Sequence, residues 1–540
     1  IARMEEIMTE LTSKTIGRCL FERSRKTPDL IGLSYRNEQY TWQEVDTISD
    51  TMALIYRDRG IKRGDHVAIW GVNSPRWVLT YYALAKLGAI QVLISTCFKK
   101  EELEHILRDN DVNFLFYGIG CKDIKYQTIL EQISWDQLPV FLDKFSLEGE
   151  EQGECAMRDA FPDPISPQNR AELLDAEARI KPEDTASILF TSGTTSSPKG
   201  VMLSHKNLLG NSQELVRQMH WNESDRFCLS VPLFHCFGIT AGILAGLHAG
   251  ADVHLLKYYK TIEVLEQIDR HHCTVLNGVP TMFLAMIKNA NRSLYNLSSL
   301  RSGIIAGSPI SETEYRRICE TLNLKHLQTS YGQTESSPCI TISAYEDSME
   351  RKATSAGKKI AGIELMIWNQ GEQKEAKIGE SGEILTRGSH VMQGYYHRPE
   401  ETREVLDEQG WLHTGDLGYL DGDHYLHVSG RIREMIIRGG ENIAPLEIEN
   451  CIRQMEQVEA VKVIGIPAEV LQEKIAACII LKKGCVVQDE DVKQFVKARL
   501  ADYKAPEFML LFSEFPLSAS GKVVIKELRR KAMEMIKTKY

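Results

Sequence analysis

One segment, residues 190–201, constrains this chain more than any other, because it gathers hydroxyls, glycines and a lysine in a single loop. It reads Phe-Thr-Ser-Gly-Thr-Thr-Ser-Ser-Pro-Lys-Gly-Val. An apolar run at 186–190 predicts a buried strand that enters the loop, and Ser204 can cap a helix that leaves it. We therefore expect the loop to be anchored at both ends.

The composition of this loop suits a phosphate group. Glycines let backbone amides approach closely, hydroxyls donate hydrogen bonds, and a lysine adds positive charge. A polar surface turn is the competing interpretation. A nucleotide P-loop would place Ser or Thr after its Gly-Lys pair, whereas Gly200 and Val201 follow Lys199 here, so P-loop kinase chemistry is disfavoured. The predicted phosphate-binding residues are Thr191, Ser192, Gly193, Thr194, Thr195 and Lys199.

The loop resembles the signature loop of the adenylate-forming superfamily, which contains acyl-CoA synthetases, carrier-protein-loading domains and firefly-type luciferases. Further segments follow in the order that this family shows. They are PLFHCFG at 232–238, SYGQTES at 330–336, GWLHTGD at 410–416, GRIREMIIRGGENI at 430–443 and SGK at 520–522. Because the segments are ordered and span most of the chain, a chance match is excluded.

Composition limits the class of protein. A chain of 540 residues, 43% of them hydrophobic, exceeds what one core usually supports, so at least two domains are expected. A net charge of −10 argues against nonspecific binding to nucleic acid and favours small-molecule partners. The 12 cysteines form no CxxC pair, which favours reduced thiols and a cytoplasmic location.

No targeting or membrane segment is predicted. Residues 1–16 carry three glutamates and lack the apolar core of a signal peptide. The longest apolar stretch, 238–253, is interrupted by glycines, His248 and Asp252, so it does not predict a transmembrane helix. Peripheral membrane contact stays open, and the family offers both monomers and homodimers.

The order of elements predicts an α/β fold. Apolar runs at 66–70 and 90–94 flank a helix at 75–87 that has Ser74 as its cap, Pro75 first and Gly88 after its end. A polar surface connection is expected between 147 and 184. The resemblance implies a large domain at 1–432, made of layered sheets and helices plus a small β-rich part. A small mobile α+β domain at 433–540 then carries the catalytic lysine.

The resemblance also implies the catalytic groups. A carboxylate that attacks the α-phosphate of ATP is repelled by it, so magnesium and fixed cations must neutralise charge. Glu335 resembles the magnesium ligand, Thr334 the phosphate-contacting residue and Lys522 the lysine that bridges the acid and the phosphate. Lys199 is the fourth expected catalytic residue. Taken in isolation, Glu335 could be a solvated surface glutamate, and the SGK segment with Lys522 could be an ordinary surface turn.

Nucleotide-binding positions follow from the same motifs. Asp416 resembles the aspartate that accepts hydrogen bonds from both ribose hydroxyls, with Arg431 beside it. Tyr331 is expected to lie against adenine. The remaining predicted positions are Ala306, Gly307, Ser308, Ser330, Gly332, Gln333 and Thr334.

Fewer features of the sequence itself support the predicted acyl-pocket and coenzyme A residues. Arg433 occupies the family's hinge position, where the small domain is expected to rotate between two half-reactions. The expected acyl-pocket residues are Phe234, His235, Phe237, Gly238, Asn277 and Val279, and the expected coenzyme A loop contains Gly439, Gly440 and Glu441. A core histidine is the alternative for His235, and the run His271, His272, Cys273 is interpreted as structural.

We therefore expect an AMP-forming acyl-CoA synthetase that uses ATP, Mg²⁺ and coenzyme A, with a medium-chain fatty acid preferred as substrate. A standalone enzyme that loads a carrier-protein pantetheine arm is an alternative within the same chemistry. A luciferase-like oxygenase and a noncatalytic nucleotide-binding protein are alternatives of other classes. No acidic residue in the pocket segments suits an amino-acid amine, which argues against an amino-acid substrate.

Overall fold

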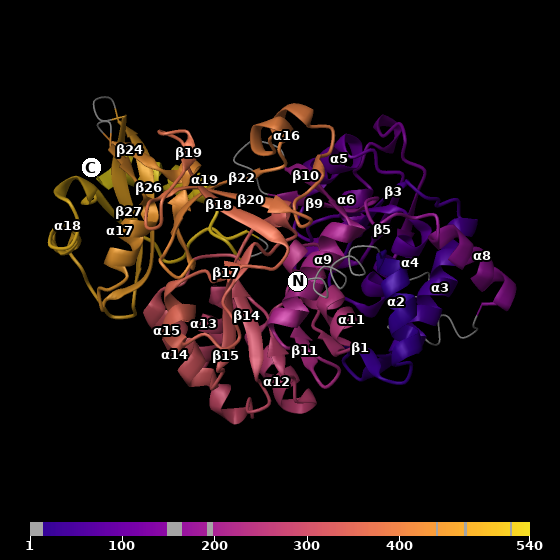
Figure 1. Ribbon diagram of the computed structural model, residues 1–540. Coiled ribbons are helices and arrows are strands. Elements are labelled where there is room, and N and C mark those ends of the chain that lie inside the picture. The colour runs from indigo at the N-terminus through magenta and orange to yellow at the C-terminus, as the bar shows by residue number, and fades with distance from the viewer. Residues whose placement is uncertain are drawn as a thin grey trace.

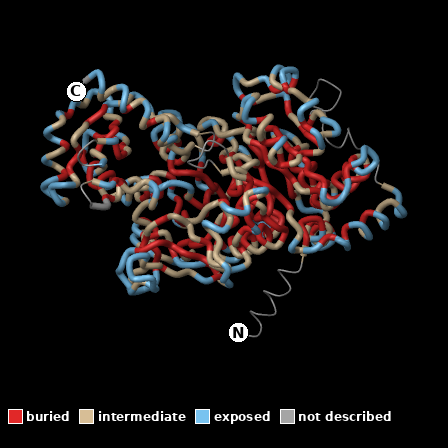
Figure 2. The backbone as a smooth tube through the Cα atoms, turned by 90° about the horizontal axis from the view of Figure 1, so that it is seen from above, coloured by how far each residue is buried: buried red, intermediate tan, exposed pale blue. Residues whose placement is uncertain are grey.

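A computed structural model describes residues 14–147, 165–191, 198–438, 441–468, 472–518 and 521–539. Two large sheets with helices around them form most of the protein, and a smaller sheet connects them to a C-terminal domain (Figure 1). Buried residues concentrate in the middle of the large domain, with a separate group in the C-terminal domain (Figure 2). The predicted α/β class and the division into a large and a small domain are confirmed.

The first large sheet has nine strands and is parallel in its centre. Parallel strands place their carboxyl ends at one edge, where ligands of α/β proteins usually bind. Its strands, in spatial order, are β17 (Lys358–Lys359), β16 (Thr341–Ile342), β15 (His326–Tyr331), β14 (Ser302–Ala306), β13 (Val275–Leu276), β11 (Arg226–Leu229), β12 (Asp252–Leu255), β1 (Ile31–Tyr35) and β2 (Glu38–Thr41).

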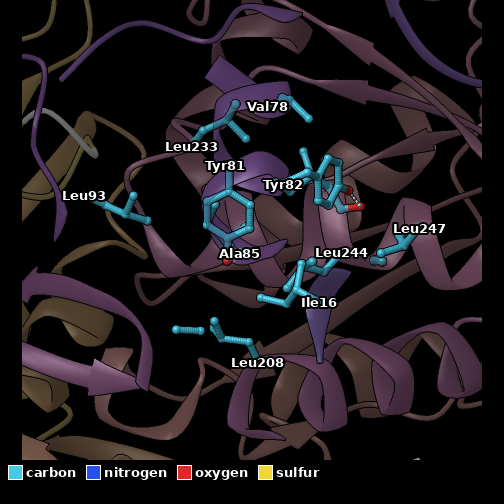
Figure 3. Packing of buried hydrophobic residues seen from close by; sticks show 14 of the residues in the cluster. Ile16, Val78, Tyr81, Tyr82, Ala85, Leu93, Leu208, Leu233, Leu244 and Leu247 are labelled. Carbon is cyan, nitrogen blue, oxygen red and sulfur yellow. Dashed lines mark hydrogen bonds between the residues drawn. The ribbon is translucent and has the colours of Figure 1, made fainter. Parts of the chain in front are cut away.

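The second large sheet has seven strands, and it contains the stems of the predicted phosphate loop. Its strands, in spatial order, are β21 (Gly394–Tyr395), β10 (Lys199–Ser204), β9 (Thr185–Thr191), β4 (Ile90–Leu93), β3 (His66–Trp70), β5 (Phe114–Tyr117) and β8 (Asp143–Ser146). Helices pack between the two sheets in one apolar cluster, to which Tyr81, Leu208 and Leu244 contribute from three different helices (Figure 3). These helices include α2 (Ile16–Lys26), α3 (Trp42–Asp58), α4 (Pro75–Leu87), α9 (His205–Gln218) and α11 (Ala245–Ala249).

Helix α4 begins and ends as the sequence predicts. The Ser74 hydroxyl accepts a hydrogen bond from the Trp77 amide, Pro75 occupies the first position, and Gly88 closes the helix at a φ of 70°. A residue with a Cβ is strained at that φ, so glycine is favoured there. Because α4 is buried on all sides between the sheets, its aromatic face packs in the core as expected.

A smaller five-stranded sheet follows the large ones and supplies the predicted β-rich part. Its strands, in spatial order, are β19 (Lys374–Glu375), β18 (Ile363–Asn369), β20 (Gly382–Gly388), β22 (Leu412–Leu420) and β23 (Leu426–Arg431). The sheet lies next to the C-terminal domain (Figure 1). Strand β23 leads through a short helical turn at Ile432–Glu434 into that domain.

The C-terminal domain has its own sheet and its own core. Its strands are β25 (Glu441–Ile443), β24 (Ile436–Arg438), β27 (Gln472–Leu481) and β26 (Val458–Ala468), with β28 (Phe508–Leu511) parallel to β27. The last helix, α19 (Ile525–Lys539), buries Leu528 and Ala532 against this sheet, as its amphipathic pattern predicts. None of the helices in the described ranges is long and apolar enough to cross a bilayer.

The polar stretch before the phosphate loop differs from the prediction. Residues 148–164 lie outside the described part, but the rest is not a simple surface connection. Helix α8 (Pro167–Glu177) forms there, capped by the Ser166 hydroxyl, and packs against α3 and α4. Only Leu173 and Glu177 are buried on this helix, so its sequence shows no apolar face from which a helix could be predicted.

Helix α8 is held by a buried cluster of charges. The Lys86 ammonium contacts Asp46 at 2.7 Å and Asp50 at 2.5 Å, and Arg170 of α8 pairs with both carboxylates. Glu177 lies beside this cluster, 5% exposed, with its Oε1 lacking a hydrogen-bond partner. Burial, reinforced by the charges of Asp46 and Asp50, raises the pKa of Glu177 to about 7 from 4.5, although Lys86 opposes the rise.

The raised pKa of Glu177 predicts a pH-dependent stability. Its protonated form stabilises the fold below pH 4.5, and this contribution is lost as the pH rises through about 7. Glu177→Gln should therefore raise the free energy of unfolding at pH 8.5 by about 2 to 3 kcal/mol and change it little at pH 5. Urea unfolding at both pH values measures this.

Glu172→Gln on the same helix is the matched control, because its side chain is 50% exposed and pairs only loosely with Arg57 at 3.6 Å. That variant should unfold like the wild type at both pH values. Equal stability of Glu177→Gln and wild type at pH 8.5 would show that Glu177 is ionised without cost in the folded protein.

Candidate functional site

The stems of the predicted phosphate loop form a β-hairpin. Thr191 at the end of β9 pairs with Lys199 at the start of β10, so the two described ends of the loop face each other. Ser192, Gly193, Thr194 and Thr195 lie outside the described residues. Ser204 caps α9 as predicted, accepting from the Asn207 amide, but the strand β10 that comes before it was not predicted.

The predicted adenine-binding segments come together at the carboxyl ends of β14 and β15. These strands are parallel, with Ala306 directly beside Ser330. Gly307 and Ser308 follow the end of β14. Tyr331 ends β15, and Gly332 and Gln333 follow it. A Cβ on Gly332 would lie 1.8 Å from the Pro338 carbonyl oxygen, so this turn accepts only glycine. The two segments therefore form one edge, as the motif positions require.

Asp416 is buried and is the centre of a hydrogen-bonded group. Its Oδ1 pairs with the Arg431 Nε at 2.9 Å from the directly opposed position on β23, and its Oδ2 accepts from the Tyr331 hydroxyl at 2.8 Å. Burial raises the pKa of Asp416, while Arg431 lowers it. The link to Tyr331 was not predicted, because the expected partner of that ring was adenine and no local pattern joins positions 85 residues apart.

Thr334 and Glu335 follow Tyr331 in a short 3₁₀ turn, η4 (Thr334–Ser336). Glu335 is buried, and its Oε1 accepts a hydrogen bond from the Tyr395 hydroxyl at 2.8 Å. Burial raises the pKa of this carboxylate, and the hydrogen bond from Tyr395 and the charge of Arg431 lower it. Tyr395 is the residue of this site that sequence reasoning missed.

The donor set around Glu335 fits Mg²⁺ in its usual protein setting. Magnesium takes hard oxygen ligands and is commonly held by one or two carboxylates together with substrate phosphates and water. Burial raises the pKa of Glu335, and a divalent cation would favour its ionised form again. Among the described residues, no cluster of three or more His, Cys, Asp or Glu could hold a metal without such phosphates.

Lys522 reaches this site from the C-terminal domain. The charges of Arg431, Asp416 and Glu335 act on its ammonium. Burial and then the charge of Arg431 lower the pKa of Lys522, while the two carboxylates raise it. A Cβ on Gly307 would lie 3.7 Å from the Lys522 Cε. The predicted catalytic lysine therefore lies among the predicted nucleotide-binding residues, although 91 positions separate it from Arg431 in the chain.

Two further contacts join the domains. Gly521 lies against the segment after β13, since a Cβ there would be 3.4 Å from the Thr281 Oγ1. On the surface, the Lys288 ammonium pairs with Glu459 at 2.7 Å. Because this ion pair is exposed, it contributes on the order of 0–1 kcal/mol, so the domains are held together weakly at that point.

His235 lies at the start of a short helix that leads into a π-helix at Ile239–Leu244. Its Nδ1 accepts from the Phe237 amide at 3.3 Å, which leaves the proton of the neutral ring on Nε2. Burial, with a smaller contribution from the Lys522 charge, lowers the pKa of His235 to about 3. The imidazole is therefore neutral at physiological pH and lies near Lys522.

The other predicted acyl-pocket residues differ in role. Asn277 is buried, donating to the Ala241 carbonyl at 2.8 Å and accepting from the Ile304 amide at 2.9 Å, so its amide joins the π-helix to β14. Gly238 faces the backbone, since a Cβ there would lie 2.2 Å from the Pro232 carbonyl oxygen. Val279, in contrast, lies beside Gly307 and Gly521. Phe234 is half-buried and Phe237 is buried.

The thiol-side positions are only partly described. Arg433 lies in the turn η5 (Ile432–Glu434) between β23 and the first strand of the small domain, which is where a hinge would have to lie. Gly439 and Gly440 lie outside the described residues. Glu441 begins β25.

The comparisons with known proteins agree with these observations. A family described as AMP-binding enzyme matches residues 20–396, and the AMP-binding enzyme C-terminal domain matches residues 447–522. YngI of Bacillus subtilis (strain 168) is 35% identical over 98% of this chain and 99% of its own length. The mitochondrial medium-chain acyl-CoA ligase ACSF2 of Bos taurus is 32% identical over 96% of this chain and 88% of its own.

Asp416→Asn is expected to weaken ATP binding about tenfold or more. The amide keeps one acceptor oxygen but loses the negative charge that holds Arg431 and the second acceptor oxygen that the predicted contact with both ribose hydroxyls requires. Calorimetric titration with ATP measures the effect. Glu364→Gln is the matched control, because Glu364 pairs with Arg387 in the same cross-strand arrangement on the same sheet but is exposed. Equal affinities of both variants would contradict the assignment.

Among solved structures, the anthranilate CoA ligase AuaEII in complex with anthranoyl-AMP superposes with a TM-score of 0.86 at 26% identity, covering 98% of this chain and 99% of that one. The match extends over both domains. The resemblance predicted from the motifs is thereby confirmed, and the chain belongs to the AMP-binding enzyme family of adenylate-forming ligases.

Proposed function

We propose that this protein is an AMP-forming acyl-CoA synthetase. The observation that carries the proposal is the position of Lys522, which comes from the small domain to lie beside Gly307, close enough to Asp416, Glu335 and Arg431 for their charges to shift its pKa. A noncatalytic nucleotide-binding protein would not need a half-buried lysine delivered from a second domain. The names of the relatives support the same chemistry, since ACSF2 is an acyl-CoA ligase and AuaEII is a CoA ligase.

In the first half-reaction, an oxygen of the substrate carboxylate attacks the α-phosphorus of ATP. The new phosphorus–oxygen bond forms as the bond to pyrophosphate breaks, which gives acyl-AMP. We assign Asp416 to the ribose hydroxyls, with Arg431 fixing its orientation. The Lys522 ammonium stabilises the negative charge shared between the acid and the α-phosphate. Mg²⁺ held by Glu335 would neutralise phosphate charge.

Thr334, next to Glu335, and Lys199, at the mouth of the loop, are assigned to the phosphates. The segments ending in Gly307 and Tyr331 are assigned to the adenine. The neutral imidazole of His235, near Lys522, is assigned to the acyl side of the site, where a neutral group does not compete with the lysine for the substrate carboxylate. Val279, beside the same lysine loop, is assigned to the pocket wall.

In the second half-reaction, the sulfur of coenzyme A attacks the acyl carbon, its proton passes to solvent or base, and AMP leaves with the bridging oxygen. Lys522 then has no charge to stabilise at phosphorus. We propose that the domain from residue 433 onward rotates about Arg433, so that Lys522 leaves and the segment 439–441 takes its place. The weak exposed contact between Lys288 and Glu459 suits a domain that must separate.

We propose a medium-chain fatty acid as substrate, on the strength of the name and 32% identity of ACSF2. AuaEII, which shares the fold, is named for an aromatic acid, so the fold itself does not select the acid. The reducing cytoplasm remains our proposed location, on the basis of the cysteine pattern in the sequence.

The purified protein, given ATP, Mg²⁺ and coenzyme A, should convert medium-chain acids with a higher kcat/KM than acetate, palmitate or benzoate. AMP and acyl-CoA should form in equal amounts, because each turnover releases one of each. Chromatographic measurement of both products tests this, with reactions lacking coenzyme A as the control. AMP or trapped acyl-adenylate without thioester would refute the synthetase and indicate a carrier-protein acceptor.

A further inference from the structure

Tyr395 lies where the phosphate-loop hairpin meets the turn that carries Glu335. Its strand, β21, pairs antiparallel with β10, with Tyr395 opposite Val201. Next to it, the Tyr396 amide donates to the Gly200 carbonyl at 2.8 Å, and the Met392 amide donates to the Glu335 carbonyl at 2.9 Å. The segment therefore fixes the start of β10 and the turn of Glu335 to each other.

The side chain of Tyr395 makes one contact with each of these two elements. Its hydroxyl donates to the Glu335 Oε1 at 2.8 Å, and the Lys199 Nζ lies 4.8 Å from the centre of its ring. A hydrogen bond to a carboxylate is stronger than one between neutral groups, and a cation within 6 Å of an aromatic face is attracted to it. One buried residue thus holds an anion at its tip and a cation at its face.

This arrangement also keeps the two charges separate. No ion pair in the described part of the chain joins Lys199 to Glu335, although both contact the same side chain. A direct pair would neutralise the lysine expected to meet phosphate and the carboxylate expected to meet the metal ion. Because the ring lies against Lys199 and only the hydroxyl reaches Glu335, each group keeps its charge for the substrate.

We propose that Tyr395 is a positioning residue for adenylation, in which the hydroxyl orients Glu335 toward Mg²⁺ and the ring holds Lys199 at the mouth of the phosphate loop. This inference rests on the roles that the proposed function gives to Glu335 and Lys199. The two contacts of the tyrosine have separable effects, because phenylalanine keeps the ring and removes only the hydroxyl.

The backbone around Tyr395 does not depend on its hydroxyl. The Tyr395 amide donates to the Thr402 Oγ1 at 2.9 Å, and the ring packs in the main apolar cluster. Tyr395→Phe should therefore fold like the wild type. The adjacent Tyr396 is a matched control, since its hydroxyl donates to Asp111 at 2.9 Å and its side chain packs in a different cluster.

The test compares Tyr395→Phe, Tyr395→Leu and Tyr396→Phe by calorimetric titration with ATP at several Mg²⁺ concentrations and in EDTA. For Tyr395→Phe, the Mg²⁺ concentration that gives half-maximal ATP affinity should rise about tenfold, as expected for the loss of a hydrogen bond to a charged group. ATP affinity in EDTA should stay at the wild-type value. Tyr395→Leu should weaken the EDTA affinity as well, because the contact with Lys199 is lost.

Tyr396→Phe should match the wild type in both titrations, and thermal unfolding checks that all variants are folded. If Tyr395→Phe behaves like Tyr396→Phe, the hydroxyl positions nothing and the proposal is overturned. If Tyr395→Leu retains the EDTA affinity, the ring does not act on Lys199. Absence of acyl-CoA formation by the wild type would refute the proposed function instead, because the binding titrations need no acid or coenzyme A.

Discussion

The placement of the half-buried Lys522 ammonium among charged groups of the other domain is the constraint on which the rest of the site depends. Removing an ammonium from water is costly unless opposite charges compensate it. The compensating carboxylates, Asp416 and Glu335, belong to the large domain, and Arg431 beside them opposes the lysine. The site is therefore complete only when the small domain is in place. The charges that favour the Lys522 ammonium and those that oppose it are nearly equal in number.

Such closely matched positive and negative charges suit a site whose substrate is itself charged. Asp416 already has both carboxylate oxygens engaged, by Arg431 and Tyr331, so it is oriented before any ligand arrives. Glu335 is likewise oriented by Tyr395. Pre-oriented groups stabilise developing charge without reorganising during the reaction. The phosphates and metal ion expected here would add the negative and positive charges that the buried groups are arranged to meet.

The sequence predicts those parts of the structure that are determined by residues close together in the chain. Helix α4 is specified by its cap, its first proline and its closing glycine, and the motifs predict that Asp416, Arg431, Glu335 and Lys522 converge. Strand β10 is missed because polar and small residues begin it, and only pairing with β9 makes it a strand. The hydrogen bonds of Asn277 are not predicted, because both partners of its amide lie more than 25 residues away in the chain.

In the proposed mechanism, Lys522 acts in adenylate formation and not in thioester formation. The most direct measurement follows the two half-reactions of Lys522→Ala separately, with Lys526→Ala, an exposed lysine nearby, as the control. Adenylate formation from acid and ATP should fall by about 10² to 10³-fold, as for the loss of one group that stabilises a developing charge. Thioester formation from supplied acyl-AMP and coenzyme A should stay near the wild-type rate. An equal loss in both half-reactions would contradict the account.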